Sequence, residues 1–433
     1  MNVADSRRLA SALEKMGYEP TNSPNDADVI VLNTCVVRQS AENKAIGRLS
    51  SLRPLKTKNP DLVISLMGCL IGVRGNTRIQ ERFPWVDVVS PPSDPGPLLQ
   101  YLGERLAREN SQAQTDQLNA LMDGELVLPR EEQGRLVSAY IPIVYGCSHA
   151  CTYCIIPSKR GIEHSRPYAE VLAEAESLAR QGVKEITLLG QIVDRYGLDL
   201  PEKRTLAGLL HDLHKIDGFK RIRFLTSHPN WMTDALLDAV AELPKVCPHI
   251  EVPIQAGDDA ILEAMRRGYT AQAYRELVQN IRDRIPGSSI ATDIIVGFPG
   301  ETDDQFQETY DLLNELRMDV AHLARYSPRE GTYSARKLED NVPAAEKMRR
   351  FRLLEELQEA ISAEINARFQ DQTVSVLFEE LSRGRWRGRT PTNKLVFVES
   401  DQDLLGQELD VKINWTGPWS MIARLCHKTE EFQ

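Results

Sequence analysis

The stretch Gly146-Cys147-Ser148-His149-Ala150-Cys151-Thr152-Tyr153-Cys154 holds three of the seven cysteines of the 433-residue chain, in a C-x3-C-x2-C spacing. Three thiolates so close together can converge on one metal centre and leave one coordination position open. Structural zinc sites usually repeat a C-x2-C pair, and no second such pair occurs here. The spacing therefore favours a 4Fe-4S cluster with one free iron. The alternatives are ordinary buried cysteines or half of a zinc knuckle.

The length and composition describe a globular protein of two or three domains. Apolar residues make up 42% and charged residues 26% of the chain, which is ordinary for soluble proteins. The sequence has no membrane-span pattern and its start has no signal-peptide form, so we expect a cytoplasmic protein without a membrane partner. Partly clustered cysteines fit a reducing compartment. The net charge of −10 means that RNA binding would need a local basic patch.

The first hundred residues alternate helix and strand signals. Apolar periodicity predicts helices at 5–16 and 39–51, and buried strands at 27–35 and 62–69. The two strands end at Cys35 and Cys69. Because ligands bind at the carboxyl edge of open α/β sheets, the repeated placement favours metal ligation by both thiols over unligated buried cysteines.

Residues 103–136 are polar and are expected to form a linker around a short helix. A strand at 140–145 then delivers the cysteine loop, and strands alternate with helices downstream. We expect strands at 185–189, 221–225, 249–253, 289–297 and 320–325, and helices that include 168–181, 303–317 and 345–369. This alternation predicts a parallel sheet curved into a partial or full βα barrel over 137–369, with active residues at the carboxyl ends of the strands.

Beyond residue 370 the pattern changes to short strands, at 374–378, 394–398, 408–413 and 420–424. These predict a small antiparallel, OB-like β-barrel. A basic run without acidic residues lies between Leu381 and Lys394 and includes one aromatic residue. Arginines can contact phosphates and an aromatic ring can stack on a base. The expected RNA-binding residues are Arg383, Arg385, Trp386, Arg387, Arg389 and Lys394; the alternative is a solvated hairpin tip.

The cysteine spacing, with Tyr153 before the last cysteine, resembles the radical S-adenosylmethionine superfamily. The resemblance implies that the methionine end of S-adenosylmethionine chelates the open iron. One electron from the cluster then splits this cofactor into methionine and a deoxyadenosyl radical, while the protein positions and shields it.

Residues 1–6, 32–35 and 68–69 are similar to the amino-terminal domain of the methylthiotransferases. That domain holds a second 4Fe-4S cluster on three cysteines, of which Cys35 and Cys69 match two. The third belongs to a Gly-Cys-Gln-Met-Asn run that this sequence enters at Met1. Since the motif resumes there without a gap, we expect a truncated gene model; the alternative is an impaired auxiliary cluster.

The resemblance also implies a set of cofactor contacts at strand ends. Gly190 and Gln191 would face the amino group of the cofactor, and Tyr326 would stack on its adenine or simply close the barrel. Arg266 would bind the cofactor carboxylate or be a solvated helix end, as would Arg267. His228 is either structural or a substrate contact, and Cys247 and Cys426 are expected to be unligated. The predicted cofactor-binding residues are Tyr153, Gly190, Gln191, Ser227, Gln255, Arg266, Asp293 and Tyr326.

Four regions follow, at 1–102, 103–136, 137–369 and 370–433, and the last resembles the RNA-binding TRAM domain. The chain looks most like the tRNA 2-methylthio-N6-dimethylallyladenosine synthases. This implies radical methylthiolation at carbon 2 of an isopentenylated adenine beside the anticodon, with two S-adenosylmethionine molecules and two clusters. Alternatives are the same chemistry on threonylcarbamoyladenosine, an RNA-binding relative without this activity, or, less favoured, a ribosomal-protein aspartate as substrate. We expect tRNA and a one-electron reductant such as flavodoxin as partners, and a monomer. The sequence does not identify the sulfur donor.

Overall fold

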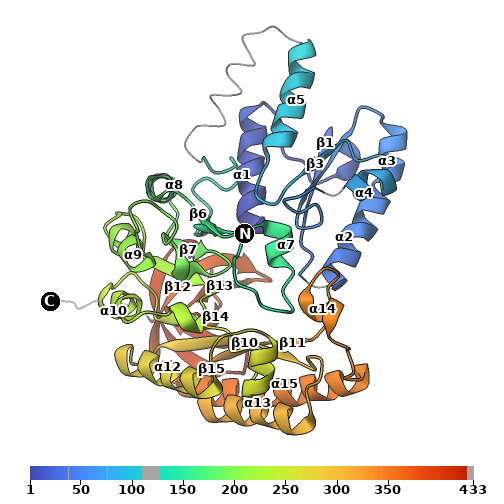
Figure 1. Ribbon diagram of the computed structural model, residues 1–433. Helices are drawn as coiled ribbons and strands as arrows, with labels where there is room; N and C mark the ends of the chain where they lie inside the picture. Colours follow the sequence, from blue (N-terminus) through green and yellow to red (C-terminus); the bar gives the residue numbers. More distant parts are fainter. Residues whose placement is uncertain (38, 76, 110–126, 427–433) are drawn as a thin grey trace, which may run out of the picture.

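The computed structural model describes residues 1–37, 39–75, 77–109 and 127–426. Figure 1 shows three regions in chain order: an open α/β domain in blue and cyan, a curved central barrel in green to orange, and a small red barrel against it. The expected linker at 103–136 lies partly outside the described residues. Its first part instead continues helix α5 (Gly96–Glu109). Within the described residues, no helix has the length and apolar character needed to cross a membrane.

A three-stranded parallel sheet, in the order β1-β2-β3, forms the amino-terminal domain. Ile64 and Leu66 of the central strand pack in one apolar cluster, while Val63 and Met67 pack in another with Leu9 of the first helix. Both faces of the central strand are therefore covered, which explains its continuous apolar run. The elements are α1 (Asn2–Lys15), η1 (Pro24–Asp26), β1 (Val29–Thr34), α2 (Gln39–Ser51), α3 (Arg53–Lys58), β2 (Val63–Gly68), α4 (Thr77–Arg82), β3 (Val88–Ser90) and α5.

The ends of β1 and β2 bring Cys35 and Cys69 to one edge of this sheet. Thr34 is paired in register with Gly68, and the Cys69 backbone N–H donates to the Thr34 carbonyl oxygen at 3.0 Å. Gly68 has a φ of +102°, and a Cβ atom there would lie 2.5 Å from the Thr34 oxygen, so only glycine fits this turn. The prediction that both cysteines end neighbouring parallel strands is confirmed.

Six parallel strands form a partial barrel in the centre of the chain. They occur as sheets β4-β7-β8 and β9-β10-β11, which are joined where the Ser227 N–H donates to the Glu251 carbonyl oxygen at 3.1 Å. No pairing between β4 and β11 occurs among the described residues. The strands are β4 (Ser138–Pro142), β7 (Glu185–Leu189), β8 (Arg221–Leu225), β9 (His249–Glu251), β10 (Ser289–Val296) and β11 (Val320–Arg325), with the short pair β5 (Val144–Tyr145) and β6 (His164–Ser165) beside them.

Helices cover the outside of this barrel (Figure 1). Several begin at a Thr or Asp whose side chain accepts a backbone N–H, namely at Thr205, Thr233, Asp258, Thr270, Thr302 and Thr332. The helices are α7 (Ile156–Arg160), α8 (Tyr168–Arg180), η2 (Val193–Arg195), α9 (Leu206–His214), η3 (Pro229–Trp231), α10 (Asp234–Glu242), α11 (Asp259–Ala264), α12 (Ala271–Arg284), α13 (Asp303–Leu316), α14 (Tyr333–Lys337) and α15 (Ala344–Ala367).

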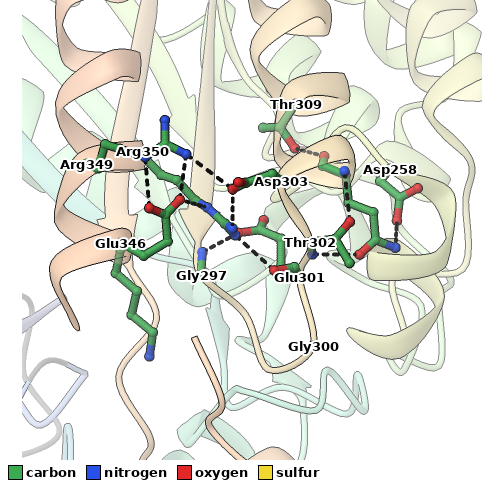
Figure 2. A network of polar contacts seen from close by, with 12 residues as sticks. Asp258, Gly297, Gly300, Glu301, Thr302, Asp303, Thr309, Glu346, Arg349 and Arg350 are labelled. Carbon is green, nitrogen blue, oxygen red and sulfur yellow. Dashed lines mark hydrogen bonds and ion pairs between the residues drawn. The ribbon is translucent and has the colours of Figure 1, made fainter. Parts of the chain in front are cut away.

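An ionic network centred on the buried Glu301 and Arg350 fixes the loop that follows β10 (Figure 2). The Glu301 carboxylate accepts the Gly297 N–H at 2.6 Å and an Arg350 Nη1–H at 2.7 Å. Arg350 also pairs with Asp303 at 2.8 Å and with Glu346 at 2.7 Å. Because these residues come from the β10 loop, α13 and α15, the network locks the two helices to the end of the strand.

The carboxyl-terminal region is a closed five-stranded barrel in the order β12-β13-β14-β16-β15. Its strands are β12 (Thr373–Ser382), β13 (Arg385–Arg389), β14 (Leu395–Val398), β15 (Glu408–Thr416) and β16 (Met421–Leu425). The pairings are antiparallel except between β14 and β16, which are parallel. The expected small barrel is confirmed, but strand β13 was missed because its arginines were interpreted as a basic binding segment.

The turn between β13 and β14 docks against the amino-terminal end of the central barrel. Arg223 donates to the carbonyl oxygens of Thr390 and Pro391 at 2.9 and 2.8 Å, and its charge pairs with Glu185. Arg221 pairs with Glu408 at 2.9 Å. The two barrels are therefore joined by buried charges that are satisfied on both sides of the interface.

Candidate active site and cluster-binding cysteines

The cysteine loop lies between β5 and α7, at the carboxyl end of the barrel strands. Thr152 anchors it: its N–H donates to the Met265 carbonyl oxygen at 3.1 Å and its hydroxyl to the Ala264 carbonyl oxygen at 2.8 Å. The Cys147 N–H donates to the Gly161 carbonyl oxygen at 3.1 Å. Gly146 has a φ of +66°, and a Cβ atom there would lie 2.0 Å from the Ile162 oxygen. The chain therefore holds this loop in one conformation from two sides.

The three thiols differ in their electrostatic surroundings. Burial raises the pKa of Cys147, and it raises the pKa of Cys154 to about 12. Burial also acts on Cys151, but contacts with His149 and Arg267 outweigh it and lower its pKa to about 7. The Arg267 Nη1–H donates to the Cys151 sulfur at 3.1 Å. Cys151 is thus the thiol that most readily becomes a thiolate, the form that ligates metals.

Unpartnered polar atoms gather beside this loop. Within the described residues, the Ser227 hydroxyl oxygen, His228 Nε2, Asp194 Oδ1 and Trp231 Nε1 are buried without hydrogen-bond partners. Buried polar groups normally have partners. Three free thiols and four unpartnered polar atoms at one end of the barrel fit a bound cluster and a polar cofactor. No three His, Cys, Asp or Glu side chains in the described residues already stand in metal-ligating geometry.

His228 is held as a neutral hydrogen-bond donor. Burial, Arg267 and His149 lower its pKa to about 2. Its Nδ1 accepts the Asn230 N–H at 3.3 Å, so the proton of the neutral ring lies on Nε2. The ring is 1% exposed and stacks on His149, with centroids 4.5 Å apart. The structure thus directs attention to His228, which the sequence left between structural and functional roles.

A cavity of about 780 Å³ lies at the same end of the barrel. Four of the predicted cofactor residues line it: Tyr153, Gln255, Asp293 and Tyr326. The amino-terminal domain contributes Val37, Gln39 and Ser40 to its wall. Arg329 ties the two domains together there, because it donates to Gln39 at 2.6 Å and pairs with Glu42. Residues of both domains therefore line this open cavity.

Backbone strain marks the same region. Thr226, Gln255 and Arg266 are non-glycine residues with φ values of +72°, +82° and +58°. Such conformations cost free energy and often occur at functional sites. Gln255 is nonetheless well held, since its N–H donates to the Asp293 carbonyl oxygen at 2.9 Å.

Other predicted cofactor residues, Gly190, Gln191 and Arg266 among them, are not part of the lining of this cavity. The exposed Arg266 guanidinium lies 4.4 Å from the centre of the Tyr333 ring, whereas the neighbouring Arg267 is buried against the cysteine loop. Arg267 is therefore the buried cation of the pair, and a role for Arg266 in cofactor binding stays a prediction. A Cβ on Gly190 would meet Val144 at 3.0 Å, so this glycine serves packing. Gln191 donates to the Met1 sulfur at 3.2 Å.

The second cysteine pair faces the same interface. Burial raises the pKa of the Cys69 thiol, and contact with Arg160 partly opposes this. Arg160, at the end of α7, donates to Asn2 at 2.9 Å and approaches the Met1 sulfur at 3.6 Å. Short helix α7 therefore links the cysteine loop to the sheet edge that carries Cys35 and Cys69. The other two thiols lie elsewhere, Cys247 at the amino-terminal end of β9 and Cys426 after β16.

The predicted RNA-binding run needs correction. Trp386 is 8% exposed and packs in the core of the small barrel, so it cannot stack on a base. Lys394 is buried and pairs with Asp319 at 2.6 Å. The arginines also have partners: Arg385 has Glu399, Arg387 has Glu379 and Glu380, and Arg389 has Asn393.

Other side chains of the small barrel remain exposed. Arg383 is exposed and forms no ion pair or side-chain hydrogen bond within the described part of the chain. Trp415 and Trp419 are 49% and 58% exposed on the same barrel. These two tryptophans were not among the predicted RNA-binding residues, although their position in a short β-hairpin with Gly417 and Pro418 was a usable signal.

Comparisons with known proteins agree with this geometry. Residues 141–313 match the radical SAM superfamily, residues 367–426 match the TRAM domain, and residues 1–90 match the uncharacterized protein family UPF0004. A solved radical S-adenosylmethionine methyltransferase, TsrM from Kitasatospora setae, has a TM-score of 0.55 and 17% identity, and covers 76% of this chain and 73% of its own. That likeness concerns the fold alone.

The fold and the cysteine loop define a radical SAM enzyme with a carboxyl-terminal TRAM domain, whose family implies a 4Fe-4S cluster and S-adenosylmethionine. The tRNA-2-methylthio-N(6)-dimethylallyladenosine synthase of Roseiflexus sp. is 48% identical over 435 residues, covering 100% of this chain and 89% of the relative. The enzyme of that name from Dehalococcoides mccartyi is 45% identical, over 99% of this chain and 97% of its own length. The chain belongs to the tRNA-2-methylthio-N(6)-dimethylallyladenosine synthase family.

Proposed function

We infer that the chain is a tRNA methylthiotransferase that attaches a methylthio group to carbon 2 of N6-isopentenyladenosine next to the anticodon. The observation that carries this function is the full-length similarity to enzymes of that name, together with the anchored loop of three free thiols. The C–H bond at carbon 2 is not acidic, so no side chain can start the reaction by removing a proton. Radical chemistry provided by a bound cofactor is therefore required.

The residues of the chain would hold and shield that cofactor. Cys147, Cys151 and Cys154 would ligate three irons of a 4Fe-4S cluster, which when bound supplies the electron that cleaves S-adenosylmethionine. Tyr153, Gln255, Asp293 and Tyr326 would line the space for S-adenosylmethionine and the target base, in the cavity of about 780 Å³. That volume lies within the usual range for small-molecule sites. Val37, Gln39 and Ser40 would help to exclude water from the domain interface.

A second cluster on Cys35 and Cys69 is part of this proposal. The two thiols follow paired strand ends, and Arg160 lies beside Cys69. All seven cysteines of the chain are described, and the remaining thiols are accounted for by the loop and by Cys247 and Cys426. Two thiols would therefore supply part of the ligand set for this cluster, which would carry the sulfur to be methylated and transferred.

The RNA partner follows from the TRAM match and the names of the relatives. The target adenine must leave its base stack to enter the cavity, and unstacking costs little free energy in an anticodon loop. A tRNA substrate would place the activity in the cytoplasm. A one-electron reductant such as flavodoxin would supply the electrons.

The test is an anaerobic assay with S-adenosylmethionine, a reductant and two tRNA substrates, one carrying isopentenyladenosine and one carrying threonylcarbamoyladenosine. Nucleoside mass spectrometry should detect methylthiolation of the first. Product only from the second tRNA would assign the chain to the threonylcarbamoyl branch. Tight binding of tRNA without product from either, in a chain with full iron content, would contradict the proposed enzyme.

A further inference from the structure

In the described part of the chain, the buried Lys and Arg side chains pair with carboxylates, with two exceptions. Most buried Lys and Arg side chains pair with a carboxylate; the pairs are Arg221 with Glu408, Arg223 with Glu185, Arg329 with Glu42, Lys347 with Asp340, Arg350 with Glu301, and Lys394 with Asp319. Within the described residues, the buried Arg160 and Arg267 form no ion pair with a carboxylate. Arg160 contacts Cys69 and Arg267 contacts Cys151. Both exceptions therefore lie at a cysteine site.

Arg267 uses its whole guanidinium in fixed contacts. It is 5% exposed. Its Nε–H donates to the Tyr269 hydroxyl at 2.8 Å, its Nη2–H to the Pro253 carbonyl oxygen at 3.3 Å, and its Nη1–H to the Cys151 sulfur at 3.1 Å. Because all three nitrogens of the planar guanidinium group donate hydrogen bonds, the group has little freedom to reorient. Its charge is thus directed at Cys151 by the loop before α12 and the end of β9.

Cys151 is the acceptor that can balance this charge. A buried cation without a counter-charge is strongly destabilising. The contacting hydroxyl cannot supply that charge near neutral pH, because burial raises the pKa of Tyr269 to about 12. The Pro253 contact is a neutral carbonyl. A negative charge on the Cys151 sulfur, or on a cluster bound to it, is what the position of Arg267 requires.

We propose that Arg267 is the fixed counter-charge of the radical-generating cluster, and that its bond to Cys151 raises the reduction potential of that cluster. This inference rests on the cluster assigned above to Cys147, Cys151 and Cys154. When an external one-electron reductant reduces the cluster, the cluster gains one negative charge and no bond is formed or broken. A nearby fixed cation and a hydrogen bond to a ligating sulfur both stabilise the more negative state. Arg267 is therefore a positioning residue that makes the cluster easier to reduce.

The test measures the midpoint potential of the cluster by redox titration followed with electron paramagnetic resonance. Cys35→Ala and Cys69→Ala are present in every sample, so that only the cluster of the loop contributes. Arg267→Gln removes the charge, and Arg267→Lys keeps it without the planar guanidinium group. Arg223→Gln, at the opposite end of the barrel, is the matched control because it also removes a buried arginine.

We expect Arg267→Gln to shift the potential to a more negative value, by about 59 mV for a tenfold lower ratio of reduced to oxidised cluster. Arg267→Lys should shift it less, and Arg223→Gln should leave it unchanged. Cleavage of S-adenosylmethionine by Arg267→Gln should be about tenfold slower with dithionite and should recover with the stronger reductant titanium(III) citrate. That recovery would separate a redox role from a merely structural one.

An unchanged potential in an iron-loaded Arg267→Gln variant would overturn the proposal, as would loss of cofactor cleavage with both reductants. If the Arg267→Gln variant does not bind iron, the Arg267→Lys variant provides the test. The proposal is then supported if Arg267→Lys binds iron and its cluster has a midpoint potential close to that of the parent protein. Failure of both variants to load would show that Arg267 only builds the loop. If the parent chain itself binds no iron, the proposed function fails first, which is a distinct result.

Discussion

The two ends of the central barrel use the same kinds of side chains in opposite ways. At the amino-terminal end, Arg223 and Lys394 are buried and each meets a carboxylate across or beside the TRAM interface. At the carboxyl end, Ser227 and His228 have polar atoms without partners in the described residues, and Arg267 meets a thiol. Paired buried charges hold domains together, whereas buried polar atoms without partners indicate a ligand. One end thus serves stability and the other serves chemistry.

The largest effect on iron content and activity should come from removing the three loop thiols at the carboxyl end of the barrel. In a Cys147→Ala/Cys151→Ala/Cys154→Ala variant we expect iron per chain to fall by about four atoms and methylthiolation to disappear. The measurement is iron and sulfide content after anaerobic reconstitution, with nucleoside analysis of tRNA. Cys247→Ala, at the amino-terminal end of the barrel, is the control, and we expect this variant to bind as much iron as the parent protein. Undiminished iron in the triple variant would refute the ligand assignment.

At the amino-terminal end of the barrel, the Arg223→Ala substitution should lower the free energy of unfolding but leave iron binding and methylthiolation unchanged. The change leaves Glu185 buried without its partner and removes the donor to Thr390 and Pro391. We expect a loss of about 3–5 kcal/mol, measured by urea unfolding.

Arg275→Ala is the control for this loss, because it breaks the exposed pair with Glu315 and should cost less than about 1 kcal/mol. If Arg223→Ala lost iron but kept its free energy of unfolding, the amino-terminal end of the barrel would not serve stability alone, and the proposed difference between the two ends would be wrong.

Between the ends, Glu251 should make stability depend on pH. Burial, reinforced by Asp293, raises its pKa from 4.5 to about 7. The folded state therefore binds the proton more tightly than the unfolded state. This contribution to stability is complete below pH 4.5 and is lost as the pH rises through about 7. Glu251→Gln should remove that slope, and above the folded pKa it should be more stable than the parent by on the order of 3 kcal/mol.

Unfolding of both proteins at a series of pH values, under anaerobic conditions, would measure this difference. Parallel stability curves for the parent and Glu251→Gln would show that the carboxyl is ionised equally in both states.

The smallest effect should come from a substitution on the surface of the TRAM domain, away from both ends of the central barrel. Arg383→Ala removes an exposed cation that has no internal partner in the described chain. We expect tRNA binding to weaken only a few-fold and the salt dependence of binding to fall by about one unit of slope. Binding measured at several salt concentrations would test this. Arg385→Ala is the matched comparison because Glu399 already neutralises that arginine, and an equal effect of the two would argue against the distinction.

Local patterns predicted much of the fold. Strands β7, β8 and β11 were predicted with the residue bounds that the structure has, because each is a short segment with several apolar residues between helical segments. Strand β13 was missed, although Trp386 and Gly388 alternate inward between outward arginines. That period of two was a usable strand signal. The number of arginines drew attention to charge instead, and charge alone does not show which side a residue faces.

The sequence predicted the positions of several site residues better than their surroundings. Tyr153, Gln255, Asp293 and Tyr326 do line one cavity, since the carboxyl ends of parallel strands must meet. The choice between Arg266 and Arg267 was beyond the sequence. It depends on the left-handed backbone of Arg266, with a φ of +58°, which turns one arginine outward and the next inward.

The sequence by itself determined the cysteine spacing, the order of the three domains and the strand ends that build the site. These properties depend on residues that are close together in the chain, so their physical causes are local. The tertiary structure decided the partner of each buried charge. Arg267 meets Cys151 across 116 positions of sequence, and Arg223 meets Pro391 across 168. Such pairs form only when the packing of distant elements removes water from both groups, and no local pattern records that event.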